Sequence, residues 1–501
     1  MPYTPGGSAG RNILQNVGHG RRFPPLAPVR GPGHIPRSAG SPTRAGRSTT
    51  MTSHDPGLSH VFYRKLTRDY PRIVRGEGCW LYDADGGAYL DAVGGAFVAN
   101  VGHGVREIAE AVGRQAERLA YVNGTAFTND PVEELAAEVA RRSPGDLDLV
   151  YPLSSGSEAV EAALKLARQY WVETGQPGRR KVIALTPAYH GNTLLALSAS
   201  ARQHYQTYFR DWLVEMVRVP APYAYRCACR GVPPLCPACS GEAVEGAILR
   251  EGPETIAALI AEPVGGSSTG ASVPAPEYWR RVRAACDRSG ILLIADEVLT
   301  GAGRTGTWSA LEPYGVVPDI MILGKGIAGG YVPLSAIVAP RRLADALAQG
   351  SGGLLHAQTF SHHATLCAGG VATLRYLRDH ALIERCAAIA PAFHERLASL
   401  RELPGVGDVR GRGLLAGVEF VADPATRTPF PRAVRFAESF AAAALEAGLV
   451  VWPSVGQADG VNGDLAMLAP PFVVSHEEID LIVQRFGEAL RATVERIGAV
   501  A

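Results

Sequence analysis

The sequence predicts an α/β fold in which a large domain with a mostly parallel sheet is joined to a smaller α+β domain. Between about residues 150 and 340, apolar runs alternate with segments of helical periodicity, as expected for parallel strands buried on both faces. Beyond residue 365 the pattern changes to Ala- and Leu-rich helices with short strands between them. The chain has 501 residues, of which 47% are hydrophobic and 19% charged, so a large core can form.

The first 50 residues have a composition that does not support a folded core. They contain seven Arg, nine Gly and eight Pro but no acidic residue. Such a segment buries too little apolar surface to offset its loss of conformational entropy. We expect residues 1–50 to be a disordered leader or a mis-start, with Met51 as a natural first residue. A targeting segment and a tail that binds a partner are the alternatives. The segment lacks the apolar run of a secretory signal, so we do not expect one.

Residues 51–105 are expected to form the N-terminal part of the small domain, built from short strands and turns. Within them, residues 80–90 predict a hairpin that turns at Asp85-Gly86-Gly87. The large domain is expected over residues 106–365 and begins with two helices, at 106–120 and 131–142.

Six strands and one further helix follow in the large domain. The helix, Ser155–Thr174, has apolar side chains at positions three and four residues apart. The strands are expected at Leu149–Leu153, Val182–Leu185, Ile256–Ala261, Ile291–Ala295, Ile320–Leu323 and Ser335–Val338. The C-terminal small domain is expected over residues 366–501, with helices at 366–379 and 432–447 and strands near 414–420 and 465–468.

Charge and cysteine content narrow the class of protein. The formal net charge is +1, which gives no general attraction to nucleic acid or to a membrane surface. No uninterrupted apolar run is long enough to predict a transmembrane helix. Eight Cys in a chain of this length do not form a disulfide framework. We therefore expect a cytoplasmic protein without a nucleic-acid or membrane partner.

Ligands bind at the carboxyl ends of strands in open α/β sheets, so the residues after each strand are informative. The first strand is followed by Ser154-Ser155-Gly156-Ser157-Glu158, small residues that open a helix and leave N–H groups for an anion. A simple serine cap with a glutamate capping box is the alternative. The second strand is followed by Tyr189-His190-Gly191, whose aromatic ring can stack on a planar ligand or serve only in packing.

Two further strand ends carry ionisable residues. Asp296-Glu297 ends a buried strand, where a carboxylate can keep a cationic ring nitrogen protonated or can form a structural ion pair with Arg. Lys325 lies between two glycines at the end of the next strand. A desolvated lysine has a lowered pKa and is a Schiff-base nucleophile. The other lysines of the chain are Lys65, Lys165 and Lys181, and each has an ordinary surface explanation.

One motif suggests a different cofactor. Residues 301–306 fit the pattern G-x-G-x-x-G of dinucleotide-binding loops, and Asp319 follows at a suitable distance. Two observations argue against this interpretation. The preceding strand ends in Asp296-Glu297, which would repel a pyrophosphate, and the residues after 306 make a poor crossover helix.

Taken in order, these motifs resemble the class III (ω-type) aminotransferases, pyridoxal-phosphate enzymes of fold type I. The resemblance covers about residues 60–490. It is carried by Ser155-Gly-Ser-Glu-Ala159, Tyr189-His-Gly191, Asp296-Glu-Val-x-Thr-Gly301, Gly303-Arg-Thr-Gly306, Asp319-Ile-Met-x-x-Gly-Lys325-Gly326, His356-Ala-Gln-Thr359 and Val409-Arg-Gly-Arg-Gly-Leu414.

The resemblance implies a role for each matching residue. Lys325 would form the Schiff base with pyridoxal 5'-phosphate, and Asp296 would hold the ring nitrogen protonated. The remaining cofactor contacts would come from Gly156 and Ser157 at the phosphate, Tyr189 and Val298 on the two ring faces, Glu262 near the cofactor, and Thr359 reaching the phosphate from the partner subunit. The last role implies a homodimer with composite active sites.

Substrate residues are implied less specifically. Phe97 would form an aromatic wall of the substrate pocket, and Arg410 of the V-R-G motif would bind a substrate carboxylate or form a salt bridge within the small domain. Trp452 stands where many relatives carry a mobile arginine. The implied reaction is ping-pong transfer of an amino group from an amine or amino acid to a keto acid or aldehyde. A racemase, aminomutase or decarboxylase of the same family is the alternative.

An insert at residues 223–241 contains four cysteines, Cys227, Cys229, Cys236 and Cys239. Four thiolates within 13 residues could bind one tetrahedral Zn²⁺, although the C-x-C half is tighter than usual for structural zinc sites. Free thiols in a surface insert are the expectation that we favour, so no metal is assigned, and a zinc site and a disulfide stay open as alternatives.

Overall fold

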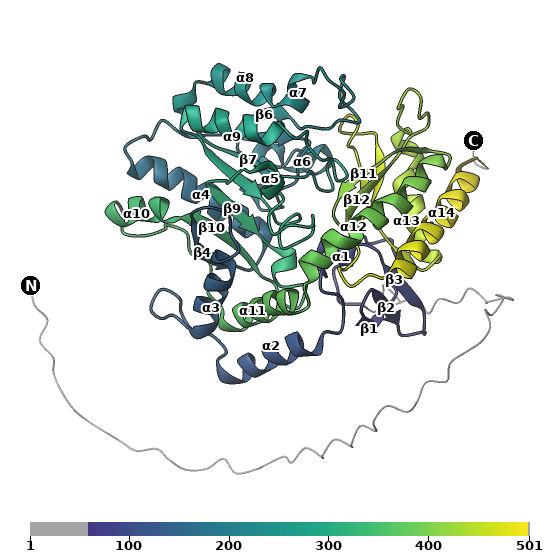
Figure 1. Ribbon diagram of the computed structural model, residues 1–501, viewed down its shortest axis with the longest axis horizontal. Helices are drawn as coiled ribbons and strands as arrows, with labels where there is room; N and C mark the ends of the chain where they lie inside the picture. Colours follow the sequence, from purple (N-terminus) through teal and green to yellow (C-terminus); the bar gives the residue numbers. More distant parts are fainter. Residues whose placement is uncertain (1–58, 499–501) are drawn as a thin grey trace, which may run out of the picture. The chain divides into compact units, whose positions relative to one another are not determined.

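The computed structural model describes residues 59–498 (Figure 1). The predictions for residues 1–50 and for a start at Met51 lie outside the described residues. Three sheets organise the described part of the chain, one of seven strands and two of four strands. Among the helices of that part, none combines the length and the apolar character needed to cross a membrane.

The seven-stranded sheet has the order β4-β10-β9-β8-β7-β5-β6. Its strands are β4 (Leu147–Leu153), β5 (Lys181–Thr186), β6 (Val217–Pro220), β7 (Ile256–Ala261), β8 (Leu292–Asp296), β9 (Ile320–Leu323) and β10 (Ser335–Pro340). The neighbours β9, β8, β7, β5 and β6 pair in parallel. All six runs predicted as strands are therefore strands, and the mostly parallel sheet is confirmed.

Strand β10 differs from the expectation, because it runs antiparallel to both of its neighbours, β4 and β9. The prediction of a parallel strand at residues 335–338 is wrong. A parallel return needs a crossover of a dozen or more residues, usually a helix. The link from β9 to β10 contains only a short 3-10 helix, η4 (Lys325–Ile327), so the chain turns back along the strand that it has just left.

Helices cover both faces of this sheet, and alternate residues of one strand enter two different cores. In β7, Ile260 packs in the core formed with α4 (Gly156–Glu173), whereas Leu259 packs in the core formed with α8 and α9. The other helices around the sheet are α5 (Leu194–Ala199), α6 (Gln203–Phe209), α7 (Pro237–Ser240), α8 (Glu242–Glu251), α9 (Tyr278–Ser289) and α10 (Arg341–Gln349).

The N-terminal segment contributes a second sheet and three helices. Strands β1 (Ile73–Glu77), β2 (Trp80–Asp83) and β3 (Ala88–Asp91) are antiparallel, which confirms the predicted hairpin. Strand β3 pairs in parallel with the C-terminal β13 (Leu449–Val450), so the two ends of the described chain share a sheet. The helices are α1 (Gly94–Phe97), α2 (Arg106–Arg118) and α3 (Asp130–Ala140), and the last two match the predicted helices within two residues. The domain boundaries at 105 and 365 stay predictions.

The C-terminal segment forms an antiparallel sheet with the order β11-β12-β15-β14, beside which α12, α13 and α14 lie in Figure 1. The strands are β11 (Val406–Arg412), β12 (Leu415–Phe420), β14 (Trp452–Val455) and β15 (Asp464–Leu468). The helices are α11 (Ala364–Asp379), α12 (Leu382–Ala398), α13 (Phe436–Glu446) and α14 (His476–Gly498). Helices α12 and α14 were not predicted from the sequence, and α12 carries Pro391 in its interior.

Candidate active site

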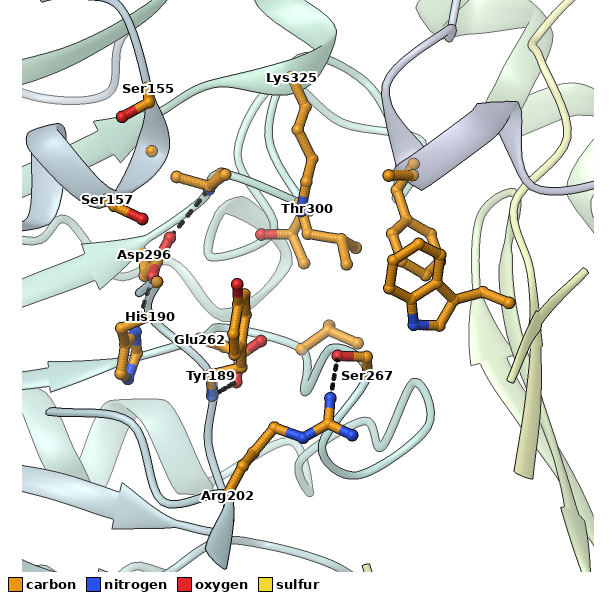
Figure 2. A pocket seen from close by; sticks show the side chains of 18 of the residues that line it. Ser155, Ser157, Tyr189, His190, Arg202, Glu262, Ser267, Asp296, Thr300 and Lys325 are labelled. Atoms are coloured by element: carbon orange, nitrogen blue, oxygen red, sulfur yellow. Dashed lines mark hydrogen bonds and ion pairs between the residues drawn. The ribbon is translucent and has the colours of Figure 1, made fainter. Parts of the chain in front are cut away.

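A cavity of about 260 Å³ lies at the carboxyl ends of β4, β5, β7, β8 and β9, with α1 and β14 completing its wall (Figure 2). Most of the site residues predicted from the sequence line this cavity. They are Phe97, Gly156, Ser157, Tyr189, Glu262, Asp296, Val298 and Lys325. Residues separated by more than 200 positions in the chain are thus brought to one place.

Lys325 is the lysine of this cavity. It directly follows β9 and Gly324, and its φ of 44° lies in the left-handed region that side chains seldom adopt. Burial lowers the pKa of the Lys325 amine, and the nearby carboxylates of Asp296 and Glu262 act in the opposite direction. A lowered pKa makes the neutral, nucleophilic amine available at lower pH. Of the other lysines, Lys65 and Lys165 are exposed and Lys181 pairs with Glu251, and none of them lines the cavity.

Asp296 is held at the end of β8 by two contacts. Its Oδ2 lies 2.7 Å from Nδ1 of His190, and its Oδ1 accepts a hydrogen bond of 3.1 Å from the backbone N–H of Val298. His190 is buried, and its backbone N–H donates to Ser200 at 2.7 Å. His190 belongs to the Tyr189-His190-Gly191 motif, but the sequence does not predict a role for its side chain. The structure shows that it fixes the orientation of the Asp296 carboxylate.

The neighbouring Glu297 is fully buried and is not among the residues that line the cavity. Its Oε1 accepts hydrogen bonds from Ser309 Oγ at 2.6 Å and from the backbone N–H of Ala310 at 2.8 Å, and its Oε2 accepts from Thr300. Burial raises the pKa of Glu297 to about 7. The two adjacent carboxylates are therefore stabilised separately, and within residues 59–498 neither forms a salt bridge with an arginine.

The start of α4 could hold an anion at the cavity wall, and its first turn is called the anion cradle. Ser155 caps the helix, since its Oγ accepts a hydrogen bond of 3.3 Å from the backbone N–H of Glu158. The capping interpretation is thus correct, and it leaves the N–H groups at Gly156 and Ser157 at the cavity wall. A Cβ at Gly156 would lie 3.0 Å from Val298, and one at Gly191 would lie 2.3 Å from Ser157 Oγ, so both glycines keep the cradle open.

The Glu262 carboxylate accepts hydrogen bonds from backbone N–H groups near the cradle and does not pair with a cationic side chain among the described residues. Its Oε2 accepts a hydrogen bond of 3.2 Å from the N–H of Tyr189, and its Oε1 accepts one of 3.0 Å from the N–H of Gly266. Burial raises the pKa of the Glu262 carboxyl group. This arrangement places the Tyr189 ring on the cavity wall, where Asn192 donates to its hydroxyl oxygen at 3.1 Å.

The outer part of the cavity combines an aromatic wall with a cation that the sequence analysis did not identify. Phe97 and Trp452 have ring centroids 5.5 Å apart, and Nζ of Lys325 lies 5.5 Å from the Phe97 centroid. Arg202 projects into the cavity from the side opposite Lys325 in Figure 2. Its guanidinium donates to Ser267 Oγ at 2.9 Å and to Ser454 Oγ at 2.7 Å.

The structure does not bring Arg410 or Thr359 to this cavity wall. The Arg410 guanidinium pairs with Asp408 at 2.9 Å and with the buried Glu419 at 2.7 Å, and it donates to the carbonyl oxygen of Thr269 at 2.6 Å. These contacts match the structural alternative for Arg410, and its role toward a substrate carboxylate stays a prediction. Thr359 is exposed, which is consistent with, but does not test, a role in a neighbouring subunit.

The glycine-rich run at 301–306 does not form a dinucleotide site. Within the described chain it leads only to the short 3-10 helix η3 (Glu312–Tyr314) rather than to a helix that could receive a pyrophosphate. Its Arg304 is buried and donates to the carbonyl oxygens of Leu414 and Pro470. Asp319 is engaged by Arg283 at 2.7 Å and also by Arg342. Through Arg304, the run after β8 is hydrogen-bonded to the C-terminal segment, which gives it a structural role.

Comparisons with known proteins point to one family. The family model described as aminotransferase class-III matches residues 65–490. An uncharacterized aminotransferase of Schizosaccharomyces pombe is 36% identical over 453 residues, covering 89% of this chain and 98% of the relative. The solved structure of an (S)-enantioselective omega-transaminase from Thermomicrobium roseum is 36% identical, with a TM-score of 0.79 over 88% of this chain and 97% of the other. A transaminase from Virgibacillus is 31% identical with a TM-score of 0.81, covering 89% of this chain and 99% of the other.

Proposed function

The chain belongs to the class III aminotransferase family and is a pyridoxal-phosphate-dependent aminotransferase, and we propose that the cavity around Lys325 is its active site. The observation that carries this proposal is that one cavity holds a buried lysine, the Asp296 carboxylate and the anion cradle of α4. The expected family and fold type I are confirmed by the family match and by the solved relatives. The relatives reported above bear the names of aminotransferases, which favours amino transfer over a racemase, aminomutase or decarboxylase.

The residues of the cavity fit pyridoxal phosphate. The N–H groups at Gly156 and Ser157 would bind its phosphate, and the open space kept by the glycines of the cradle admits that group. Tyr189 and Val298 would face the two sides of its ring, and Asp296 would hold the ring nitrogen protonated. When bound, pyridoxal phosphate supplies an electron sink for the charge that develops at the substrate α-carbon.

The protein's own contribution is to bind, orient and transfer a proton. Lys325 would hold the cofactor through its side-chain amine, and the same amine, when free, would be the base that takes the proton from the substrate α-carbon. Its lowered pKa favours the neutral amine that this step requires. His190 orients Asp296 through the contact of 2.7 Å, so that the carboxylate faces the cavity rather than the loop that surrounds Glu297.

Transamination is tested most directly by its two half-reactions. An amino donor alone should convert the bound cofactor once and release one carbonyl product per active site, and a keto acid should then restore the starting absorption. Pyruvate and 2-oxoglutarate, each combined with a panel of amine donors, would identify the acceptor. Turnover that proceeds without an acceptor, with inversion or loss of the carboxyl group, would instead identify a racemase or a decarboxylase.

The active form is proposed to be a homodimer. Thr359 belongs to an exposed segment in which Leu355 is 74% and Phe360 is 51% exposed. Phe127, which is 66% exposed, adds to the large apolar side chains on the surface of the chain. Exposed apolar side chains that gather into one patch commonly mark a contact with another subunit, and we infer such a contact here. Thr359 would then reach the phosphate in the partner's cavity.

We further propose that the substrate carries a carboxylate and that Arg202 binds it. Burial lowers the pKa of Arg202, and within residues 59–498 no carboxylate forms a salt bridge with its guanidinium. A desolvated guanidinium that donates its hydrogen bonds to two serine hydroxyls, Ser267 and Ser454, can bind an anionic ligand with a charge-assisted pair of hydrogen bonds. Arg410 cannot offer this group without breaking its pairs with Asp408 and Glu419.

Replacing Arg202 with methionine is expected to raise KM for amino-acid and keto-acid substrates about 10- to 100-fold. This is the loss of affinity that corresponds to the free energy of one hydrogen bond to a charged group. KM for a simple amine donor should change much less. Arg410→Met is the matched control, and it should lower thermal stability because Glu419 is left buried without that partner. Steady-state kinetics with paired substrates measure both variants. If Arg410→Met, and not Arg202→Met, shows the carboxylate-specific rise in KM, then Arg410 binds the substrate.

A further inference from the structure

The four cysteines of the insert at residues 223–241, which we call the cysteine insert, converge on one point. The sulfurs of Cys227 and Cys229 lie 3.3 Å apart, those of Cys229 and Cys236 lie 3.4 Å apart, and those of Cys227 and Cys239 lie 3.2 Å apart. All four sulfurs lie within 4.8 Å of one another. The four side chains therefore form a compact cluster rather than separate surface thiols.

This spacing is close to that of a tetrahedral metal site. Zinc binds thiolate sulfur at about 2.3 Å, so four sulfurs around one zinc lie about 3.8 Å from one another. The sulfur separations in the cluster bracket this value. All four cysteines are free, so no disulfide draws any pair of them together. Four thiols have no strong attraction for one another that would gather them in this way.

The backbone of the cysteine insert is shaped around the same point. Arg230 and Gly231 follow Cys229 with φ values of 57° and 72°, which turns the chain back toward the sulfurs. The N–H groups of Gly231 and Cys236 donate to the Cys229 sulfur. Cys236 caps the short helix α7, and Cys239 lies within that helix. Backbone N–H donors around ligand sulfurs orient the ligands and offset the charge of a metal–thiolate centre.

We propose that Cys227, Cys229, Cys236 and Cys239 bind one Zn²⁺ in a structural site. Four cysteine sulfurs fill the tetrahedral positions of zinc, so no position stays open for water or substrate and the metal takes no part in amino transfer. The proposed zinc site differs from the free thiols that the sequence favours. The sequence gives the spacing of the cysteines along the chain, but it does not show that the pair Cys227 and Cys229 meets the pair Cys236 and Cys239.

The site would stabilise the contact between the cysteine insert and the C-terminal sheet. Tyr223, at the start of the insert, donates to Glu419 of β12 at 2.5 Å, and Arg226 donates to the same carboxylate at 2.6 Å. Arg226 also donates to the carbonyl oxygen of Arg427 at 2.5 Å. Cys227 follows Arg226 directly in the chain. Fixing Cys227 to three other cysteines therefore restricts the residues that approach the buried Glu419.

Metal analysis of the full-length enzyme tests the proposal without any substitution. Protein purified without chelator from zinc-supplemented medium should contain about one zinc per chain, and an organomercurial reagent should release that zinc as four thiols react. Cofactor content measured in the same sample shows that the protein is folded. Enzyme that binds cofactor but lacks zinc, does not take it up on dialysis against zinc, and exposes four titratable thiols in this insert would overturn the proposal.

Single substitutions locate the metal. Cys236→Ala should reduce zinc affinity at least about tenfold and lower the midpoint of thermal unfolding. Cys286→Ala is the matched control, since Cys286 is buried on α9 and is not part of the cluster, and it should retain the zinc. Zinc that stays bound in Cys236→Ala but is lost in Cys286→Ala would place the metal elsewhere and overturn the assignment.

Discussion

Replacing Lys325 with alanine is expected to lower kcat at least about 10⁴-fold while the fold and non-covalent cofactor binding persist. Under the proposed function, the variant loses both the amine that would bind the cofactor covalently and the base that would move the α-proton. No other lysine lines the cavity to take over either role, among residues 59–498. Steady-state kinetics, circular dichroism and cofactor absorption measure the three expectations.

Lys165→Ala is the matched control for this loss. Lys165 is exposed on α4, the helix whose first turn forms the proposed phosphate cradle, and its replacement should leave kcat within a few-fold of the wild type. Reduction of the wild-type enzyme with borohydride, followed by peptide mapping, should find the cofactor on Lys325. A cofactor adduct on Lys65, Lys165 or Lys181 would disprove the assignment.

Replacing Asp296 with asparagine is expected to lower kcat about 10²- to 10³-fold, the effect of removing one preorganised electrostatic partner from an active site. The amide has nearly the shape of the carboxylate but no charge with which to hold the ring nitrogen protonated. His190→Gln removes the contact that orients Asp296 but keeps the Asp296 charge, so it should reduce kcat less and shift the pH profile of the bound cofactor. Spectrophotometric titration of both variants measures this shift.

Glu297→Gln separates a loss of chemistry from a loss of stability. Glu297 is buried beside Asp296, but its oxygens accept hydrogen bonds from Ser309, Ala310 and Thr300 and do not line the cavity. Its replacement should lower the free energy of unfolding by about 1–3 kcal/mol. The N–H₂ group of glutamine cannot accept the hydrogen bonds that these groups donate to the carboxylate, so buried donors are left unpaired. Its kcat should stay within a few-fold of the wild type. Equal kinetic loss in Asp296→Asn and Glu297→Gln would show that Asp296 has no specific role.

The sequence predicted the strands and the strand-end residues well because both depend on local patterns. Buried parallel strands are continuous apolar runs, and Lys325 between two glycines is difficult to explain as a surface residue. The direction of β10 was not predictable in this way, since an apolar run looks the same in a parallel and in an antiparallel strand. That direction depends on the link of residues 324–334, which is too short for a helical crossover.

Residues whose roles depend on tertiary contacts were harder to identify. His190 lies beside Tyr189 in the chain, but its contact with Asp296 joins residues 106 positions apart. Arg202 is one of 45 arginines, and nothing local distinguishes it from those on the surface. Arg410 shows the reverse case, because its buried partner Glu419 lies on the neighbouring strand β12 and becomes apparent only when the register of β11 and β12 is known.

Strand β10 also governs when the cavity around Lys325 can form during synthesis. Strand β4 leads into the proposed phosphate cradle of α4, yet in the described sheet its only neighbour is β10, which is translated long after it. Until residues 335–340 have left the ribosome, β4 has no strand to join and presents an unpaired apolar edge. Nascent chains that end before β10 are therefore expected to bind chaperones and not to bind the cofactor. The seven-stranded sheet is complete only when β10 has been inserted between β4 and β9.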